Sequence, residues 1–142
     1  MKDLLDAKTL LKSQDHGIFS TISKKFPGYP FGSLLPYMVT EDDQIICWVS
    51  QIAQHSINLQ EEPKASLTIT STEAARDQER LCLLVTTKRL TQDINTLKKA
   101  YLNKFPLAAK YIEIHDFFPL LLEVQAAYYI GGFGRALWVD WT

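Results

Sequence analysis

The amino-acid sequence predicts a mainly β domain with flanking helices, in which an antiparallel sheet closes into a barrel. Strand-like segments outnumber helical ones and follow one another in hairpin-like runs, which favours antiparallel pairing over a parallel doubly wound sheet. Residues 120–130 carry the clearest signal, because their side chains alternate with the period of two that marks a strand. We expect six or seven strands, with the helices packed outside the barrel.

The N-terminal segment predicts a helix followed by a strand. Leu4, Ala7 and Leu11 recur at helical spacing, with acidic side chains in the first turn, where the helix dipole favours them. We expect this helix to end near Gly17, since glycine readily takes the left-handed conformation found at helix C-termini. Residues 17–23 then predict the first strand.

Two further strands are predicted as a hairpin, at residues 33–39 and 45–49. Pro36 lacks the N–H donor of a strand ladder, so its strand is expected at a sheet edge or at a bulge. A short helix is predicted at residues 50–60, with Ser50 as its N-cap.

The second half of the chain begins with two predicted strands, at residues 65–70 and 80–90, joined by a polar loop at 72–79. A helix follows at residues 91–103, and a second short helix is expected at 107–112. The alternating strand at 120–130 comes after these helices.

A glycine-rich segment at residues 131–134 could suggest a dinucleotide-binding loop. Such a loop needs a following helix whose N-terminus faces the pyrophosphate, and too few residues remain here to form one. The segment therefore predicts a tight turn into a last strand at residues 137–139.

Composition narrows the function classes. The chain has 142 residues, with 15 basic and 16 acidic side chains and a formal net charge of -1, which argues against non-specific nucleic-acid binding. The length predicts one domain over residues 1–142, and the apolar runs are too short to span a membrane. Cys47 and Cys82 are far apart, which predicts neither a disulfide framework nor a zinc site and favours a cytoplasmic location.

The three histidines give no metal-binding pattern. His16, His55 and His115 are not spaced as metal ligands, and no carboxylate-rich cluster accompanies them. We therefore predict no metal site, and we expect His16 and His115 to be solvated or capping residues at the ends of elements.

Two polar stretches are candidate ligand-binding segments. In residues 50–58, free N–H groups at a helix start can hold a phosphate, and His55 and Ser56 can add hydrogen bonds; simple capping and surface polarity are the alternative. In residues 29–33, aromatic side chains beside Gly32 and Ser33 suit a planar ring ligand, and a packed loop is the alternative.

Several stretches in one order resemble a known family. The chain is similar to the pyridoxamine 5'-phosphate oxidase-like family, in the branch that includes the haem-utilisation proteins, and the resemblance covers nearly the whole chain. The stretches that carry it are residues 29–33, 50–59, 62–67, 80–83, 116–117 and 131–136.

The resemblance implies a split β-barrel that binds FMN and works as a homodimer, with the ligand at the interface between the subunits. It implies no catalytic residue that can be named. It places one strand along the flavin, the segment after residue 49 at the FMN phosphate, and an arginine near the flavin ring. The implied cofactor-binding residues are Gly32, Ser33, Pro36, Tyr37, Ser50, His55, Ser56 and Arg80.

Departures from the family pattern leave three functions open. The Ser-Arg-Lys run of the oxidase is replaced by Ala53–His55, so a true pyridoxamine phosphate oxidase is not expected. The C-terminal histidine of the haem-utilisation branch is absent, and Asp116 lacks the histidine partner that the family gives it. The first hypothesis is an FMN-binding oxidoreductase, the second a haem-binding or haem-degrading protein, and the third a non-catalytic dimeric interaction module.

Overall fold

The fold is seen in a computed structural model, which describes residues 1–71, 79–114, 116–132 and 134–142. His115, Phe133 and most of the predicted 72–79 loop lie outside the described residues. The described part contains three α-helices, one 3-10 helix and eight strands. Their bounds are α1 Lys2–Ser13, β1 His16–Ile22, β2 Pro30–Pro36, β3 Met38–Val39, β4 Ile45–Ser50, α2 Gln54–Glu61, β5 Lys64–Thr70, β6 Arg80–Arg89, α3 Ile94–Lys104, η1 Pro106–Lys110, β7 Phe117–Ile130 and β8 Ala136–Val139.

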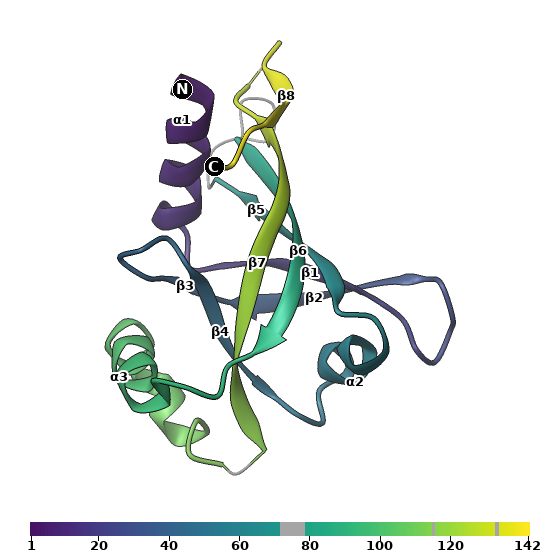
Figure 1. Cartoon of the computed structure of the whole chain (residues 1–142), viewed down its shortest axis with the longest axis vertical. Helices are drawn as coiled ribbons and strands as arrows, with labels where there is room; N and C mark the ends of the chain where they lie inside the picture. The colour runs from purple at the N-terminus through teal and green to yellow at the C-terminus, as the bar shows by residue number, and fades with distance from the viewer. Residues whose placement is uncertain (72–78, 115, 133) are drawn as a thin grey trace.

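All eight strands form one antiparallel sheet, which confirms the predicted fold class. Its order is β2-β1-β5-β6-β7-β4-β3, and β8 pairs with β7 off this path. The sheet curves into a half-barrel, with the long strand β7 running through the middle of the molecule (Figure 1). The three helices lie at the periphery of the sheet (Figure 1).

The sheet has an inner, buried face and an outer face. Along β1, Phe19 and Thr21 are fully buried, whereas the alternating residues Ile18 and Ile22 are exposed. Helix α1 covers part of the inner face, because its buried side chains belong to the same core as Phe19. Apolar burial of this kind is the main stabilising contribution to the fold.

A second, smaller core lies under α3 and η1. Trp48 and Tyr101 are its largest buried side chains, with ring centroids 5.6 Å apart. This cluster packs α3 and η1 against β4, beside the lower end of β7 (Figure 1). In the described residues, no helix is long and apolar enough to cross a membrane.

The predicted role of Gly17 is wrong. Helix α1 ends at Ser13, and Gln14 takes an extended conformation at its C-cap. Gly17 lies inside β1, where a Cβ atom would stand 2.7 Å from the backbone oxygen of Thr68 and 3.0 Å from Leu67. The glycine is needed for the close approach of β1 and β5, and this tertiary contact has no local sequence signal.

The predicted strand at 33–39 is really two strands, which explains why there are more strands than we expected. β2 begins earlier, at Pro30, and pairs with β1, while β3 pairs with β4. The strand is interrupted at Tyr37, whose backbone N–H donates to the Asp15 carbonyl at 3.0 Å and not to a neighbouring strand. Pro36 does lie on an edge strand, as predicted.

The C-terminal predictions hold. The strand predicted at 120–130 is β7, which begins slightly earlier, and it pairs with β8 through an antiparallel hairpin. Gly132 and Gly134 have φ values of 117° and 82°, which only glycine adopts readily. The glycine-rich segment is therefore a turn and not a phosphate-binding loop.

Candidate functional site

Strand β2 and helix α2 bring Ser33 and His55 together. The Oγ of Ser33 lies 3.4 Å from Nδ1 of His55, and the imidazole packs edge-on against Phe19 with centroids 5.8 Å apart. Burial lowers the pKa of His55, so the neutral ring is favoured. Its Nε2 is buried and has no hydrogen-bond partner among the described residues, which leaves a polar atom ready for a ligand.

Asn58 fixes the helix that carries His55. Its amide nitrogen donates to Thr21 Oγ1 at 2.9 Å, and its oxygen accepts from the Lys24 N–H at 3.0 Å and from Gln54 at 3.1 Å. The side chain is fully satisfied and buried, so it ties α2 to β1. Sequence reasoning missed this residue, because a lone asparagine in a polar segment carries no signal of burial.

Ser50 is not the N-cap of α2, contrary to our prediction. The helix begins at Gln54 with Ala53 as its N-cap, and Ser50 ends β4 instead. Its hydroxyl donates to Oδ2 of Asp116 at 2.8 Å and accepts from the Ile52 N–H at 3.3 Å. The partner that determines this orientation is 66 residues away in sequence, and Oδ1 of Asp116 stays buried without a partner among the described residues.

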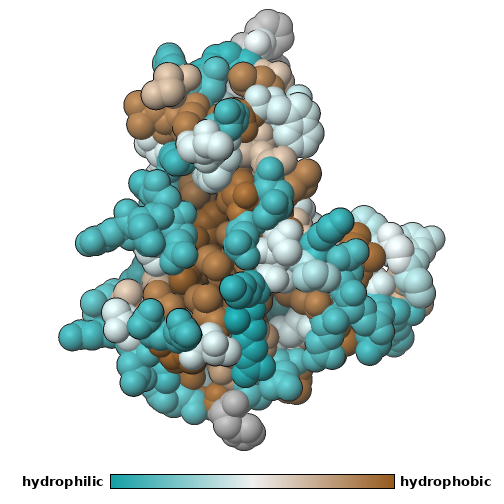
Figure 2. All heavy atoms as spheres, viewed as in Figure 1, coloured by the Kyte–Doolittle hydropathy of each residue, from teal (hydrophilic) through white to brown (hydrophobic). Residues whose placement is uncertain are grey.

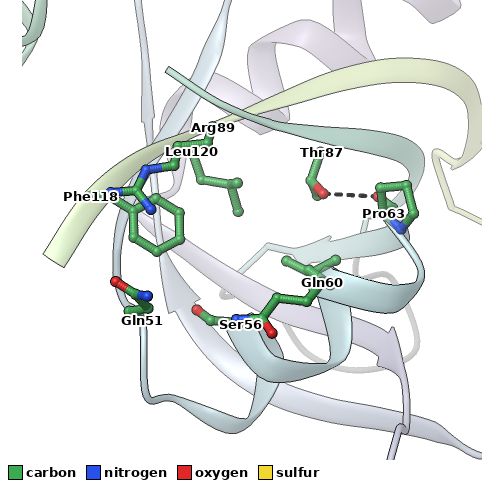
Figure 3. A pocket seen from close by; sticks show the side chains of 9 residues that line it. Gln51, Ser56, Gln60, Pro63, Thr87, Arg89, Phe118 and Leu120 are labelled. Atoms are coloured by element: carbon green, nitrogen blue, oxygen red, sulfur yellow. Dashed lines mark hydrogen bonds between the residues drawn. The ribbon is translucent and has the colours of Figure 1, made fainter. Parts of the chain in front are cut away.

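Ser56 lies apart from His55, although the two are adjacent in sequence. Successive helix residues point about 100° apart at 3.6 residues per turn. His55 faces Ser33, whereas Ser56 lines a pocket between α2 and the ends of β6 and β7 (Figure 3). The predicted phosphate segment is therefore divided between two places.

The other four predicted ligand residues lie at four different places in the sheet. Gly32 faces outward beside Ser20. Pro36 ends β2 opposite the first residue of β1. Tyr37 is fully buried and donates its hydroxyl to the Leu11 carbonyl at 2.5 Å, so its side chain does not reach the surface. Arg80 begins β6 opposite Thr70, at the other end of the strand from α2.

The outer face of the sheet carries an uncovered apolar row. It crosses six strands in register, and its most exposed members are Leu34 at 62%, Ile18 at 47% and Trp138 at 61%. Helices α1 and α2 bury their side chains on the opposite, inner side. The row consists of Leu34, Ile18, Thr68, Cys82, Tyr128 and Trp138.

Exposed apolar side chains gathered on one face of a sheet are a candidate site for a partner or a flat ligand. Apolar atoms also gather over β7 in the view of Figure 2, with polar atoms on both sides. Within the described ranges, no three His, Cys, Asp or Glu residues are grouped as metal ligands. A ligand on the outer face would thus be held mainly by apolar contact and by single polar groups such as Arg80.

Comparisons with known proteins agree on one fold. Residues 5–142 match the family described as "CREG, beta-barrel". The chain is 32% identical over 136 residues to "Non-canonical heme oxygenase HOZ, chloroplastic" of Arabidopsis thaliana, a match that covers 92% of this chain and 41% of that protein. The chain thus spans less than half the length of this relative.

Solved structures give the same result. A haem-binding protein from Mycobacterium smegmatis has a TM-score of 0.86 at 27% identity, over 97% of this chain and 57% of that one. The haem storage protein HutZ of Vibrio cholerae has a TM-score of 0.75 at 19% identity, over 95% of this chain and 100% of that one. At the latter identity the likeness concerns the fold alone.

Proposed function

This chain belongs to the CREG beta-barrel family, a split-barrel family related to pyridoxamine 5'-phosphate oxidase, and from that membership we propose that it binds haem. The proposed site is the outer face of the sheet, between two copies of the chain. The observation that carries the proposal is the uncovered apolar row from Leu34 to Trp138. The names of two relatives above 25% identity support it.

The residues of the outer face suit the chemistry of haem. Haem is a flat, largely apolar ring with two carboxylates, so it needs apolar contact and a cation. Ile18 and Leu34 supply the contact, and the exposed Arg80 lies on the same face, two residues before Cys82. Arg80 forms no ion pair within the described ranges, which leaves its guanidinium available to a carboxylate.

His16 is the described histidine on this face. It lies two residues before Ile18 in β1, and its Nδ1 stands 2.6 Å from Oδ1 of Asp15. A carboxylate at one ring nitrogen orients the other toward a metal, so Nε2 of His16 is our candidate iron ligand. Bound haem would supply the redox chemistry of its iron, while this chain would hold and orient the ring.

The haem proposal is tested by titrating haemin into the purified protein and following the Soret band. We expect a saturable spectral change in the wild-type protein. In His16→Ala, the Soret band and the ferric EPR signal of the bound haem should be shifted relative to wild type. In Leu34→Asp, the apparent Kd for haemin should rise at least about tenfold. Leu107→Asp is the matched control, because Leu107 is 75% exposed but lies in η1. A titration without saturation would refute haem binding.

We also propose that the outer face joins two chains in a homodimer. Exposed apolar side chains in register across several strands are typical of a surface buried by a second copy. Analytical ultracentrifugation should find a dimer that Leu34→Asp converts largely to monomer and that Leu107→Asp leaves intact. A monomeric wild-type protein, or equal dissociation by both variants, contradicts this interface.

FMN is the second candidate ligand, and the observation that favours it is the pair formed by Ser33 and His55. The Nε2 of His55 could donate to a phosphate oxygen, and Ser33 could add a hydroxyl. FMN fluorescence should then be quenched on binding, and His55→Leu should abolish the quenching without lowering haem affinity. A protein that binds neither ligand but still dimerises would instead support the third hypothesis, a non-catalytic dimeric interaction module.

A further inference from the structure

The pocket that Ser56 lines lies beside α2, on the side away from the contact between His55 and Ser33. It has a volume of about 210 Å3 and opens between α2 and the ends of β6 and β7 (Figure 3). This size is below the roughly 300–1,000 Å3 typical of sites for drug-sized ligands, so it suits a small molecule and not a flavin or a haem. Its lining residues are Gln51, Ser56, Leu59, Gln60, Pro63, Thr87, Arg89, Phe118 and Leu120.

The hydroxyl of Ser56 gives the pocket a polar group that lacks a partner. Ser56 is only 4% exposed, and its Oγ has no hydrogen bond within the part of the chain that the structure describes. The hydroxyl of Thr87, by contrast, already has a partner, because Thr87 Oγ1 donates to the Pro63 carbonyl at 2.9 Å (Figure 3). Leaving a buried hydroxyl unpaired is unfavourable, so a ligand atom that accepts its proton is stabilised here.

The charge of the lining favours an anion. The guanidinium carbon of Arg89 lies 4.3 Å from the ring centroid of Phe118, and stacking on the ring leaves its N–H donors at the edge free. Arg89 makes no ion pair among the described residues, and the lining contains neither Asp nor Glu. The amides of Gln51 and Gln60 can donate further hydrogen bonds to the same ligand.

The rest of the lining is apolar. Leu59 from α2, together with Leu120 and the ring of Phe118 from β7, supplies apolar lining. A bare inorganic anion would leave these side chains wet, whereas a carboxylate with a short apolar body would cover them. One cation matches one negative charge, since a second charge would stay uncompensated in a partly desolvated pocket.

We propose that this pocket binds a small organic monocarboxylate, with its carboxylate at Arg89 and Ser56 and its apolar body against Leu59 and Leu120. The site is separate from the outer face and from the pair formed by His55 and Ser33. It therefore stands whether or not the chain binds haem or FMN.

Benzoate is the probe for this site, followed by amide and arginine side-chain NMR signals of the full chain. We expect saturable shifts confined to the backbone N–H groups around Ser56 and the side-chain signal of Arg89. Benzamide, which has nearly the same shape and no charge, should bind at least about tenfold more weakly. Equal binding of benzoate and benzamide would show that no anion site exists.

Two variants and one control locate the interaction. Arg89→Gln should weaken benzoate binding at least about tenfold, and Ser56→Ala should weaken it severalfold. Lys88→Gln is the matched control, because it also removes one positive charge from the same strand, but Lys88 does not line the pocket. A similar loss in Lys88→Gln, or shifts centred on Arg80, would place benzoate elsewhere and overturn the proposal.

Haem titration of the same variants keeps the two proposals distinguishable. Arg89→Gln should leave the haem Soret titration unchanged, because Arg89 lies beside α2 and not on the apolar row. Benzoate at saturation should likewise leave it unchanged. Competition between benzoate and haem would contradict the separate pocket.

Discussion

The side-chain amide of Asn58 donates to the hydroxyl of Thr21 at 2.9 Å, and both side chains are buried. This contact joins α2 to β1 at the point where His55 meets the inner face of the sheet. Since the Asn58 oxygen also accepts two hydrogen bonds, one side chain holds three partners in place.

Asn58→Ala should lower the free energy of unfolding by about 2–3 kcal/mol, because it leaves Thr21 and the Lys24 N–H without their partner. Urea denaturation measures this change. Asn103→Ala is the matched control in the exposed face of α3, and it should change stability by less than about 0.5 kcal/mol. Equal effects of the two substitutions would contradict a positioning role for Asn58.

Gly17→Ala should destabilise the fold by about 1–3 kcal/mol, because the new Cβ would meet the Thr68 backbone oxygen at 2.7 Å. Gly32→Ala tests whether the effect comes from close approach and not from glycine itself. The nearest atom to its new Cβ is a flexible side-chain carbon of Ile18 at 3.4 Å, so its melting temperature should change little. The prediction fails if Gly17→Ala melts at the wild-type temperature.

Stability should fall as the pH drops below about 6.5, and His55 should account for part of the fall. Burial lowers the pKa of His55 from 6.5 in the folded protein, so the unfolded chain binds the proton first as the pH decreases. The unfolding free energy is then unaffected by His55 above that pH and decreases below it.

His55→Gln removes this titration. Urea denaturation between pH 5 and 7.5 should therefore give a shallower dependence on pH for the variant than for the wild type. Hydrogen bonds from Arg135 and Lys12 lower the pKa values of the Asp3 and Asp43 carboxyls from their ordinary value of 3.8. These carboxyls therefore titrate below this pH window and do not affect the comparison. Identical slopes for the two proteins would refute the assignment to His55.

Cys47 should resist alkylation in the folded protein, while Cys82 should react once the outer face is uncovered, as in the monomeric Leu34→Asp variant. Cys47 is fully buried, and burial raises the pKa of its thiol, so the reactive thiolate is scarce. Cys82 is half-buried on the outer face. Iodoacetamide followed by mass spectrometry should find one modified site in the folded Leu34→Asp variant and two in urea. Early modification of Cys47 would mean that the core opens locally.

Sequence reasoning was most successful where a pattern is local. The alternation in residues 120–130 predicts β7 because one face of the strand packs on the core, and Pro36 predicts an edge because it lacks a ladder donor. Glycine was ambiguous: at residue 132 the turn needs a positive φ, whereas Gly17 is needed for a contact with another strand. Only the first of these requirements can be read from neighbouring residues.

The candidate site was harder to predict, because its geometry depends on contacts between distant segments. Ser50 has the composition of an N-cap, but Asp116 determines its hydrogen bond. His55 and Ser56 were expected to act together, and the helix turns them to different sides. The apolar row on the outer face depends on the register of six strands, which no single strand pattern reveals.

The position of β7 has a consequence for biosynthesis. This strand pairs with β4 and β6, which both precede it in the chain and are therefore translated before it. Until residues 117–130 leave the ribosome, β4 and β6 each keep an unpaired edge, the kind of surface on which nascent chains associate wrongly. The central pairings of the sheet therefore form only after β7 has been made, and arrested nascent chains ending at residue 116 should remain sensitive to protease.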